Sequence, residues 1–408
     1  MNTNYSIHKR SFLETSEIIY TFIIAFSAST GTSSVKICRL LVVAAFIMEV
    51  AFNNTKIGIL PTQYGKWATS FFCICALSIV WTVSSSNVLS NLSTQLYILI
   101  VDLILVRSLV KNKQLIVEVM KAVIYGAVMH GLKIYALHGP LVYLFERGGN
   151  GVENANTLAY VASIGAIFCY ILIQEIQRRN KILFGFMFIV NVLFALLTVS
   201  KKIFIFLGVF FVAVYILKAK NPLKVIGNLL ISAFAVFLVY IAIMKIGFLY
   251  SLVGYRFETM IAGFLGLATD GSTGFRLHLI QWGMEWFSVK PMFGYGLDCY
   301  KYLLGNTYDT WVGTAGVYAH NNYVELLVDL GLVGTVAYYY IYVSALIKGI
   351  KLKKESNYPI YGVAIFIMLA VAEYGQITYS IAFLQEIILL AWIFIDQQQV
   401  LDRGKRIE

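Results

Sequence analysis

LKVIGNLLISAFAVFLVYIAIMKIG, residues 223–247, decides the fold. It is an apolar run whose two charged residues, Lys224 and Lys245, stand near its ends. About 20 such residues cross the hydrocarbon core of a bilayer as a helix. Lipid offers no partner for backbone N–H and C=O groups, so an apolar run of this length has to satisfy them internally. The run therefore predicts a transmembrane helix.

Similar runs recur along the whole chain. Of its 408 residues, 59% are hydrophobic and only 13% are charged, whereas roughly a quarter of the residues of a soluble protein are charged. We expect an all-α, polytopic integral membrane protein with about 12 transmembrane helices and one large extracytoplasmic loop. The candidate spans are 17–31, 34–52, 66–83, 92–110, 115–138, 157–175, 181–199, 202–218, 223–247, 323–347, 359–374 and 379–396.

Positive charges alternate along the connections between these runs. They gather on every second one, in groups at 9–10, 56–66, 111–113, 178–181, 218–224, 348–354 and 403–406. Because Lys and Arg favour the cytoplasmic side, the alternation predicts a multi-pass protein of the cytoplasmic (inner) membrane with both termini inside. The first apolar run is interpreted as an uncleaved span, since cleavage would upset this alternation.

The same pattern divides the chain into three parts. Residues 1–247 hold predicted helices one to nine, residues 248–322 form the extracytoplasmic loop, and residues 323–408 hold helices ten to twelve and a cytoplasmic tail. In the loop, large apolar residues recur at helical spacing and predict an amphipathic helix that lies on the bilayer surface or on the bundle. These residues are Phe275, Leu279, Trp282 and Trp286, and the glycine-rich turn PMFGYG follows them.

Some positive charges lie on the predicted outer side, against the rule. They are Lys201 and Lys202 in the tight turn VSKKI, and Arg256, Arg276, Lys290 and Lys301 in the loop. An anionic ligand would explain them, and ordinary variation is the alternative. We favour the ligand for the two lysines of the turn, which stand between two spans, and leave Lys290 and Lys301 open.

The residue types of the loop narrow the chemistry. Its histidines and carboxylates show no metal-binding spacing, and there is no phosphate loop or serine nucleophile motif, so we predict neither a metal nor a cofactor. What remains is a set of cations with a histidine, His320. Arginine binds phosphates with two parallel hydrogen bonds, and histidine can act as a general base near neutral pH. The set suits transfer of a sugar chain from a lipid diphosphate, although His320 could equally cap a helix or line an interface.

Two segments carry a resemblance to a known family. GSTGFRLHLIQWGMEWFSVKPMFGYGL (271–297) and AHNNYVELLVDLGLVG (319–334) resemble the O-antigen ligase/polymerase family. The shared pattern is an arginine, an aromatic helix, P-x-x-G-x-G, and then His-Asn opening a span with L-G-L-x-G. NGVENANTLAYVASIG (150–165) and LLTVSKKIFIFLGVFF (196–211) are similar to two further family segments. The resemblance covers about half of the chain, from Asn150 to Gly334.

The resemblance implies roles for single residues. Arg276 would bind the diphosphate and His320 would assist the acceptor hydroxyl. The family has arginine after the turn serine where this chain has Lys201, which keeps the charge but loses the planar fork. The predicted diphosphate site comprises Lys201, Lys202, Arg256 and Arg276, and Asn321 and Asn322 are predicted to contact the acceptor glycan. His278 lies outside the pattern and is interpreted as structural.

The predicted function follows from this family. It is a metal-independent polymerase of the glycosyltransferase type, joining undecaprenyl-diphosphate-linked repeat units into O-antigen, capsular polysaccharide or exopolysaccharide outside the membrane. One alternative is a ligase that transfers the finished glycan to a lipid core or another acceptor. Another is a transporter of the lipid-linked glycan, which would place ionisable groups in mid-membrane. Its candidates Asp102, Lys121, His130 and Lys133 lie mostly near the ends of predicted spans.

The expected partners are the lipid-linked oligosaccharide and membrane lipid. A chain-length regulator is left open as a further partner, and nucleic acid is not expected.

Overall fold

Every element of regular structure is a helix. The computed structural model describes residues 10–28, 32–53, 62–146, 151–175, 178–265, 271–307, 317–354 and 356–396, and these contain no β-strand. The all-α prediction is confirmed. The main elements are α1 (Phe12–Ser27), α2 (Ser33–Asn53), α3 (Gln63–Leu77), α4 (Ser85–Lys111), α5 (Gln114–His138), α6 (Val142–Phe145), α7 (Ala155–Glu175), α8 (Arg178–Leu197), η2 (Phe204–Val209), α9 (Phe210–Leu217), α10 (Pro222–Lys245), α11 (Gly247–Leu249), η3 (Tyr250–Gly254), α12 (Tyr255–Phe264), α13 (Gly271–Val289), α14 (Cys299–Thr307), α15 (Asn322–Leu352), α16 (Tyr358–Ala372) and α17 (Ala382–Asp396).

Each predicted span overlaps a helix, but not every helix has the length of a span. In the described part of the chain, six helical stretches are long and apolar enough to cross a membrane: Ser85–Lys111, Gln114–His138, Ala155–Glu175, Asn180–Leu197, Pro222–Lys245 and Asn322–Leu352. Phe204–Leu217 and Tyr358–Ala372 are shorter apolar helices. The structure supports a polytopic membrane protein, and the count of about 12 spans stays a prediction.

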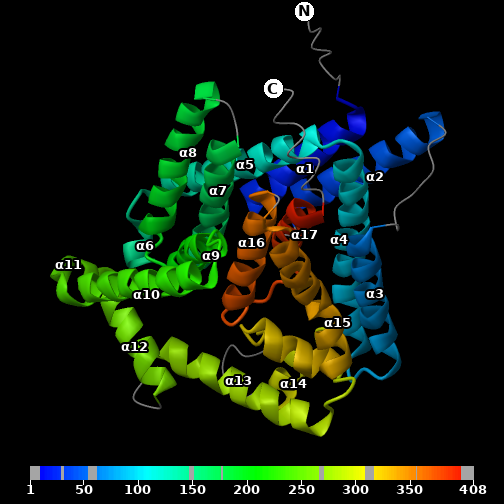
Figure 1. Cartoon of the computed structure of the whole chain (residues 1–408). Coiled ribbons are helices and arrows are strands. Elements are labelled where there is room, and N and C mark those ends of the chain that lie inside the picture. Colours follow the sequence, from blue (N-terminus) through cyan, green and yellow to red (C-terminus); the bar gives the residue numbers. More distant parts are fainter. Residues whose placement is uncertain are drawn as a thin grey trace, which may run out of the picture.

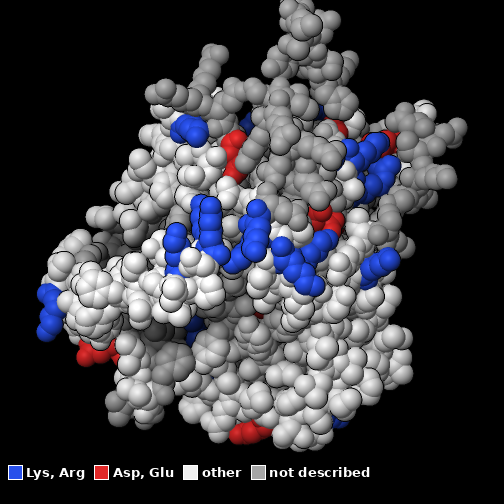
Figure 2. Space-filling view, in the orientation of Figure 1, with Lys and Arg blue, Asp and Glu red and all other residues white. Residues whose placement is uncertain are grey.

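Connections that the charge pattern puts on one side contact one another. On the predicted outer side, the contacting pairs are Val83–Tyr295, Asn87–Asp298, Asn156–Ser200, Lys202–Gln376 and Asn322–Glu373. The pairs at the other end are Arg10–Glu118, Glu14–Asn112 and Lys348–Asp396. Lys and Arg side chains form a band across one face in Figure 2, over the region where Figure 1 shows α9 and α16. These contacts agree with the alternation, and the sidedness of the connections stays a prediction.

A break divides α15 at Gly331, where φ is 64° and ψ is −165°. The segment 291–296 fills the break by exchanging backbone hydrogen bonds with both sides of it (Figure 1). The bonds run from Leu332 N to Pro291 O (2.8 Å), from Val333 N to Met292 O (3.2 Å), from Tyr295 N to Val328 O (2.9 Å) and from Gly296 N to Asp329 O (2.8 Å). Unpaired backbone groups are costly at membrane depth, so the two segments complete each other. The predicted span 323–347 thus consists of two helical pieces that meet at Gly331.

Two glycines permit this close approach. A Cβ on Gly331 would lie 2.5 Å from the Phe293 backbone nitrogen, and one on Gly294 would lie 2.6 Å from the Asp329 carbonyl carbon. Both glycines also have positive φ, 64° at Gly331 and 67° at Gly294. The motifs P-x-x-G-x-G and L-G-L-x-G are thus two halves of one backbone contact.

The predicted amphipathic helix is present as α13, and it lies on the bundle. Leu279 and Trp282 are buried, and Tyr300 donates a hydrogen bond to the Leu279 carbonyl (2.5 Å). Gly283 packs directly against Val324 of α15. Of the two predicted positions, bilayer surface or bundle, the structure supports the bundle.

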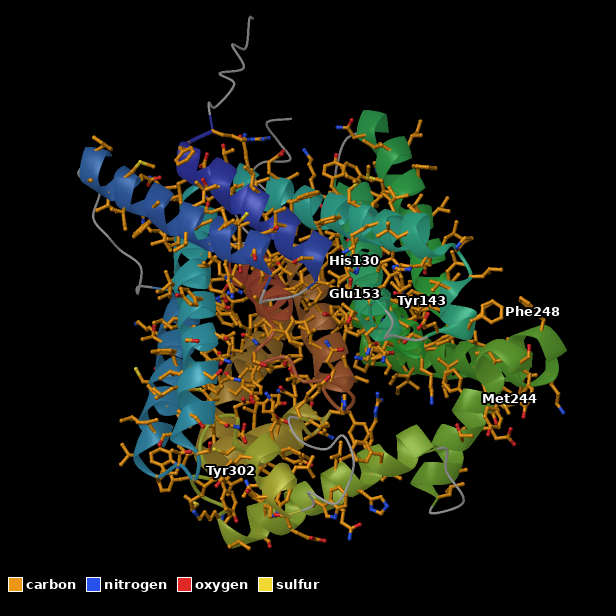
Figure 3. The ribbon with its side chains drawn as sticks, turned by 180° about the vertical axis from the view of Figure 1, so that it is seen from behind. His130, Tyr143, Glu153, Met244, Phe248 and Tyr302 are labelled. Atoms are coloured by element: carbon orange, nitrogen blue, oxygen red, sulfur yellow. The ribbon has the colours of Figure 1, made fainter. Side chains whose placement is uncertain are left out.

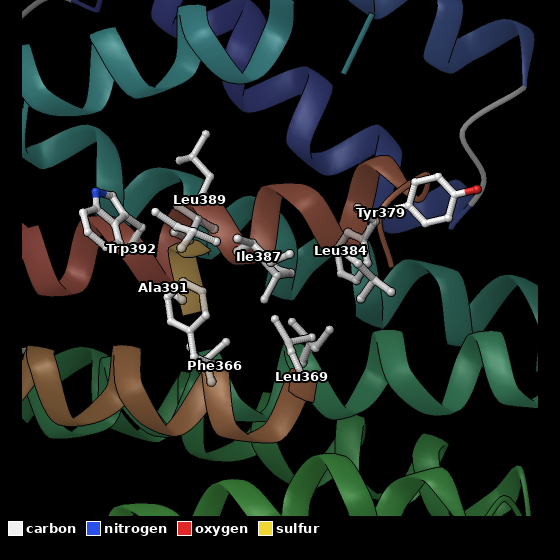
Figure 4. Packing of buried hydrophobic residues seen from close by; sticks show 14 of the residues in the cluster. Phe366, Leu369, Tyr379, Leu384, Ile387, Leu389, Ala391 and Trp392 are labelled. Atoms are coloured by element: carbon white, nitrogen blue, oxygen red, sulfur yellow. The ribbon is translucent and has the colours of Figure 1, made fainter. Parts of the chain in front are cut away.

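The last helix, α17, lies at the centre of the bundle. It is buried from Ala382 to Ile395, and Figure 4 shows Leu384 and Ile387 facing Phe366 and Leu369 of α16. Small residues let membrane helices approach closely. A Cβ added to Gly362 of α16 would lie 2.5 Å from the Ala391 carbonyl oxygen.

Two ionisable residues that we expected near span ends are buried. Asp102 lies well inside α4, and its carboxylate accepts a hydrogen bond from the Tyr64 hydroxyl (2.8 Å). His130 is fully buried in α5 beside Glu153, with 3.6 Å between its Nε2 and a carboxylate oxygen. Figure 3 shows His130 and Glu153 together, with Tyr143 nearby. We expected both side chains to reach the membrane interface. They do not, because neighbouring helices cover Asp102 and His130.

We predict that Gly331→Ala lowers the thermal unfolding temperature of the detergent-purified protein. Alanine at this φ and ψ costs about 1–3 kcal/mol, and its methyl group would displace residues 291–296. Gly227→Ala is the matched control: nothing lies within 4 Å of a Cβ there, and alanine favours the helix. Equal unfolding temperatures for the two variants would contradict a role of the break in stability.

Candidate functional site

The turn after α8 is fastened to the start of α7. Val199 has φ of 50°, an uncommon value for a β-branched residue, and it reverses the chain direction. Ser200 Oγ donates to Asn156 Oδ1 (2.7 Å) and accepts a hydrogen bond from the Lys202 backbone N–H (3.3 Å). Two of the segments that carried the family resemblance thus meet here, and the contact orients Lys202.

Lys202 projects from this turn toward the side chains of Tyr160 and Gln376. Its ammonium lies 5.8 Å from the centre of the Tyr160 ring and donates a hydrogen bond to Gln376 Oε1. Lys201, one residue earlier, is half-buried in the same turn. The choice between Lys201 and Lys202 for the predicted anion site stays open.

The charge of Arg276 acts on Lys202, and the charges of both residues act on His320. Burial, and after it the charge of Arg276, lowers the pKa of Lys202 to about 7. Burial also lowers the pKa of His320 to about 4, with the charges of Arg276 and Lys202 as the next causes. These charge effects connect three residues that span 118 positions of the chain, from 202 to 320.

In the part of the chain that the structure describes, no acidic side chain forms an ion pair with Lys202 or Arg276. Two like charges in a partly buried site repel each other, and an anion between them removes the repulsion. An anion site at Lys202 and Arg276 with His320 beside it stays a prediction.

The backbone holds His320 in a sharp turn. Its φ is 53°, and its ring lies 4.1 Å from the Tyr318 ring, measured between centroids. The preceding Ala319 N–H donates to a carboxylate oxygen of Glu325 (2.5 Å). Positive φ at a non-glycine residue is uncommon and recurs at functional sites.

Asn321 and Asn322 fasten the chain on the other side of His320. Asn321 Oδ1 accepts hydrogen bonds from the backbone N–H groups of Tyr323 (3.0 Å) and Val324 (3.1 Å), so Asn321 is the N-cap of α15. The capping role considered for His320 is therefore wrong. Asn322 is fully buried, donates to the Tyr339 hydroxyl (3.1 Å) and accepts from the Thr378 N–H (2.9 Å). Contact of Asn321 or Asn322 with a glycan stays a prediction.

The other cations of the loop lie elsewhere or have local partners. The side chain of Arg256, in α12, lies outside the described residues. Lys290 lies over the Tyr295 ring (4.7 Å to its centre), and Lys301 pairs with Asp298 (2.9 Å). His278 is exposed and stacks on Trp282, as its structural interpretation expects. In the described part of the chain, no three His, Cys, Asp or Glu residues are grouped to hold a metal ion.

The sequence interpretation missed the α16–α17 connection. Gln376 contacts Lys202, and Glu373 accepts hydrogen bonds from Tyr339 (2.8 Å) and Tyr342 (2.6 Å). A signal was present: Glu373, Gln376 and Thr378 are polar residues in a short connection between two apolar runs.

The comparison with known families bears on the segment that holds this site. Residues 186–339 match a family model described as O-antigen ligase. The match is consistent with an O-antigen ligase/polymerase family, and it confirms the resemblance predicted from the sequence. It includes Lys202, Arg276 and His320. No curated protein matches the chain. The match points to an O-antigen ligase/polymerase-type function and suggests a glycan-processing enzyme.

We predict that Lys202 titrates near neutral pH. After reductive ¹³C-methylation, one lysine signal in the NMR spectrum should titrate with a pKa of about 7 and be absent from Lys202→Met. Arg276→Gln should move this pKa upward, because it removes a neighbouring positive charge. A spectrum in which every lysine titrates near its usual value of about 10.4 would contradict the site as described.

Proposed function

We propose that this protein is a polysaccharide polymerase that joins lipid-diphosphate-linked repeat units on the outer face of the cytoplasmic membrane. The growing glycan on undecaprenyl diphosphate is the donor, and the distal sugar of a new repeat unit is the acceptor. One observation carries the proposal: two cations with no acidic partner among the described residues share a partly buried site with His320. The family match is the second support.

The cations bind and stabilise the diphosphate. Arg276 binds the diphosphate with two parallel N–H···O bonds, and Lys202 adds a compact positive charge from the turn after α8. The glycosidic diphosphate leaves as undecaprenyl diphosphate, and both cations offset the charge that develops on its bridging oxygen. The lipid tail stays in the bilayer while the sugar extends into water.

His320 accepts the proton of the attacking hydroxyl. The acceptor oxygen forms a bond to the anomeric carbon of the donor as the bond from that carbon to the diphosphate oxygen breaks, and the hydroxyl proton goes to an imidazole nitrogen. A histidine with a pKa of about 4 is neutral at pH 7 and can accept it. The bound diphosphate raises this pKa, because its negative charge offsets Arg276 and Lys202. Binding of the donor thus makes the base stronger when it is needed.

A ligase is the second candidate, because the matched family model is described as O-antigen ligase. Polymerase and ligase share the donor site and differ in the acceptor. The product distinguishes them: a polymerase yields a ladder of repeat units on undecaprenyl diphosphate, and a ligase yields glycan on a lipid core or another acceptor.

One observation favours a transporter. Buried carboxylates lie within the helices, with Asp102 bonded to Tyr64 and Glu386 bonded to Thr21 (2.5 Å), and ionisable groups inside a membrane often mark transport paths. A transporter would lose function in Asp102→Asn and retain it in His320→Asn. A polymerase would show the opposite order.

We predict that His320→Asn and Arg276→Lys each abolish polymer in cells at normal protein level. Asparagine cannot take a proton, and lysine replaces the planar fork with one ammonium. Loss of a general base costs about 10²–10⁴ in rate. The exposed His278→Asn is the control and should give polymer of normal length. Wild-type chain length in His320→Asn would exclude the catalytic role of His320.

Purified enzyme should polymerise in excess EDTA, and activity that returns only with Mg²⁺ would contradict metal independence.

We also predict that α13 faces outward and that both termini are cytoplasmic. In a cysteine-free chain, Ser288→Cys of α13 should react with an impermeant thiol reagent on whole cells, because Ser288 is exposed. Asn357→Cys, exposed before α16, should react only after the cells are opened. The reverse pattern would overturn the orientation derived from the lysine-rich connections.

A further inference from the structure

Gln376 is a buried amide with half of its hydrogen-bonding capacity in use. It lies in the α16–α17 connection, is 4% exposed, and accepts the hydrogen bond from Lys202 Nζ through Oε1. Its Nε2 group has no hydrogen-bond partner among the described residues. Buried polar groups are rarely left unpaired, and this one lies beside a cation with no acidic partner. A ligand that carries acceptor oxygens would satisfy both.

The connection around Gln376 is held firmly in place. Glu373 accepts hydrogen bonds from Tyr339 and Tyr342 and also from Thr378. The Thr378 backbone N–H in turn donates to Asn322 Oδ1 (2.9 Å), two residues after His320. Gln376 is therefore positioned by the same contacts that hold the start of α15.

We propose that Gln376 is a binding residue for the diphosphate, with its Nε2 donating to a non-bridging oxygen while its Oε1 retains Lys202. This inference rests on the proposed function and adds a third element, the α16–α17 connection, to the donor site. Residue 376 lies outside the matched segment 186–339. An amide suits both tasks, because it offers an acceptor to Lys202 and a donor to the anion. A carboxylate would keep the first and repel the diphosphate.

The substitution Gln376→Glu separates binding from positioning. Glutamate still accepts from Lys202, so a purely positioning residue would tolerate the change. A diphosphate ligand would not, because the donor is lost and a negative charge is added. Gln376→Met removes donor and acceptor at similar volume. Gln281→Glu is the matched control: it adds the same charge on exposed α13, where Gln281 Nε2 donates to Glu285 (3.2 Å).

The experiment measures the affinity of undecaprenyl diphosphate for the purified protein in lipid nanodiscs. This probe is independent of the glycan. We expect Gln376→Met to weaken binding about tenfold and Gln376→Glu about a hundredfold or more, since hydrogen bonds to charged groups are strong. Gln281→Glu should bind like the wild type. Thermal unfolding and the titration of Lys202 monitor the fold, and Gln376→Glu should raise the pKa of Lys202 by pairing with it.

The experiment distinguishes a failure of the proposed function from a failure of the binding role of Gln376. If the wild type binds undecaprenyl diphosphate no better than Arg276→Gln does, the proposed function fails and this inference with it. If the wild type binds, Arg276→Gln does not, and folded Gln376→Glu binds like the wild type, only the role of Gln376 is overturned. Should Gln376→Glu fail to fold, folded Gln376→Met with wild-type affinity decides against the inference.

Discussion

The backbone exchange between residues 291–296 and the broken helix α15 is the contact on which the rest of the structure depends. A helix cannot be interrupted at membrane depth unless other groups take over its hydrogen bonds. Here the loop segment does so on both sides of Gly331. The break turns residues 322–330 away from the rest of α15, so that they lie against α13 (Figure 1). His320 stands just before this piece, and the charges of Arg276 and Lys202 act on it.

Three of the four residues of the proposed site come from short connections or a helix start, and Arg276 comes from the helix α13. The α8–η2 turn contributes Lys202, α13 contributes Arg276, the start of α15 contributes His320, and the α16–α17 connection contributes Gln376. Each connection is fastened by hydrogen bonds from side chains, such as Ser200 to Asn156 and Asn322 to Thr378. This rigidity lets two cations stay together without a carboxylate, and it keeps them ready for an anion.

Much of the fold was predictable from hydropathy alone, because a membrane requires long apolar runs and a helical backbone. The motif order also singled out Arg276 and His320, and left a choice between Lys201 and Lys202, of which Lys202 contacts Gln376. The break at Gly331 was not predictable, since its hydrogen-bond partners come from another segment. Nor was the contact of Gln376 with Lys202, which joins residues 174 positions apart. Asn321 shows the same limit. It is adjacent to His320 in the sequence, and only the backbone geometry shows that Asn321, and not His320, caps the helix.

The sequence by itself determined that the chain is helical and that it belongs in a membrane. It also showed that the positive charges on the predicted outer side go against the usual charge distribution and call for an explanation. Composition and charge alternation decide these points, because they depend on transfer to lipid and on charge placement, which act residue by residue. The tertiary structure alone decided which cations share a site, how a helix could break there, and which amide lies beside Lys202. These points depend on contacts between distant segments, and a hydrogen bond or a lowered pKa exists only once both partners have been brought together.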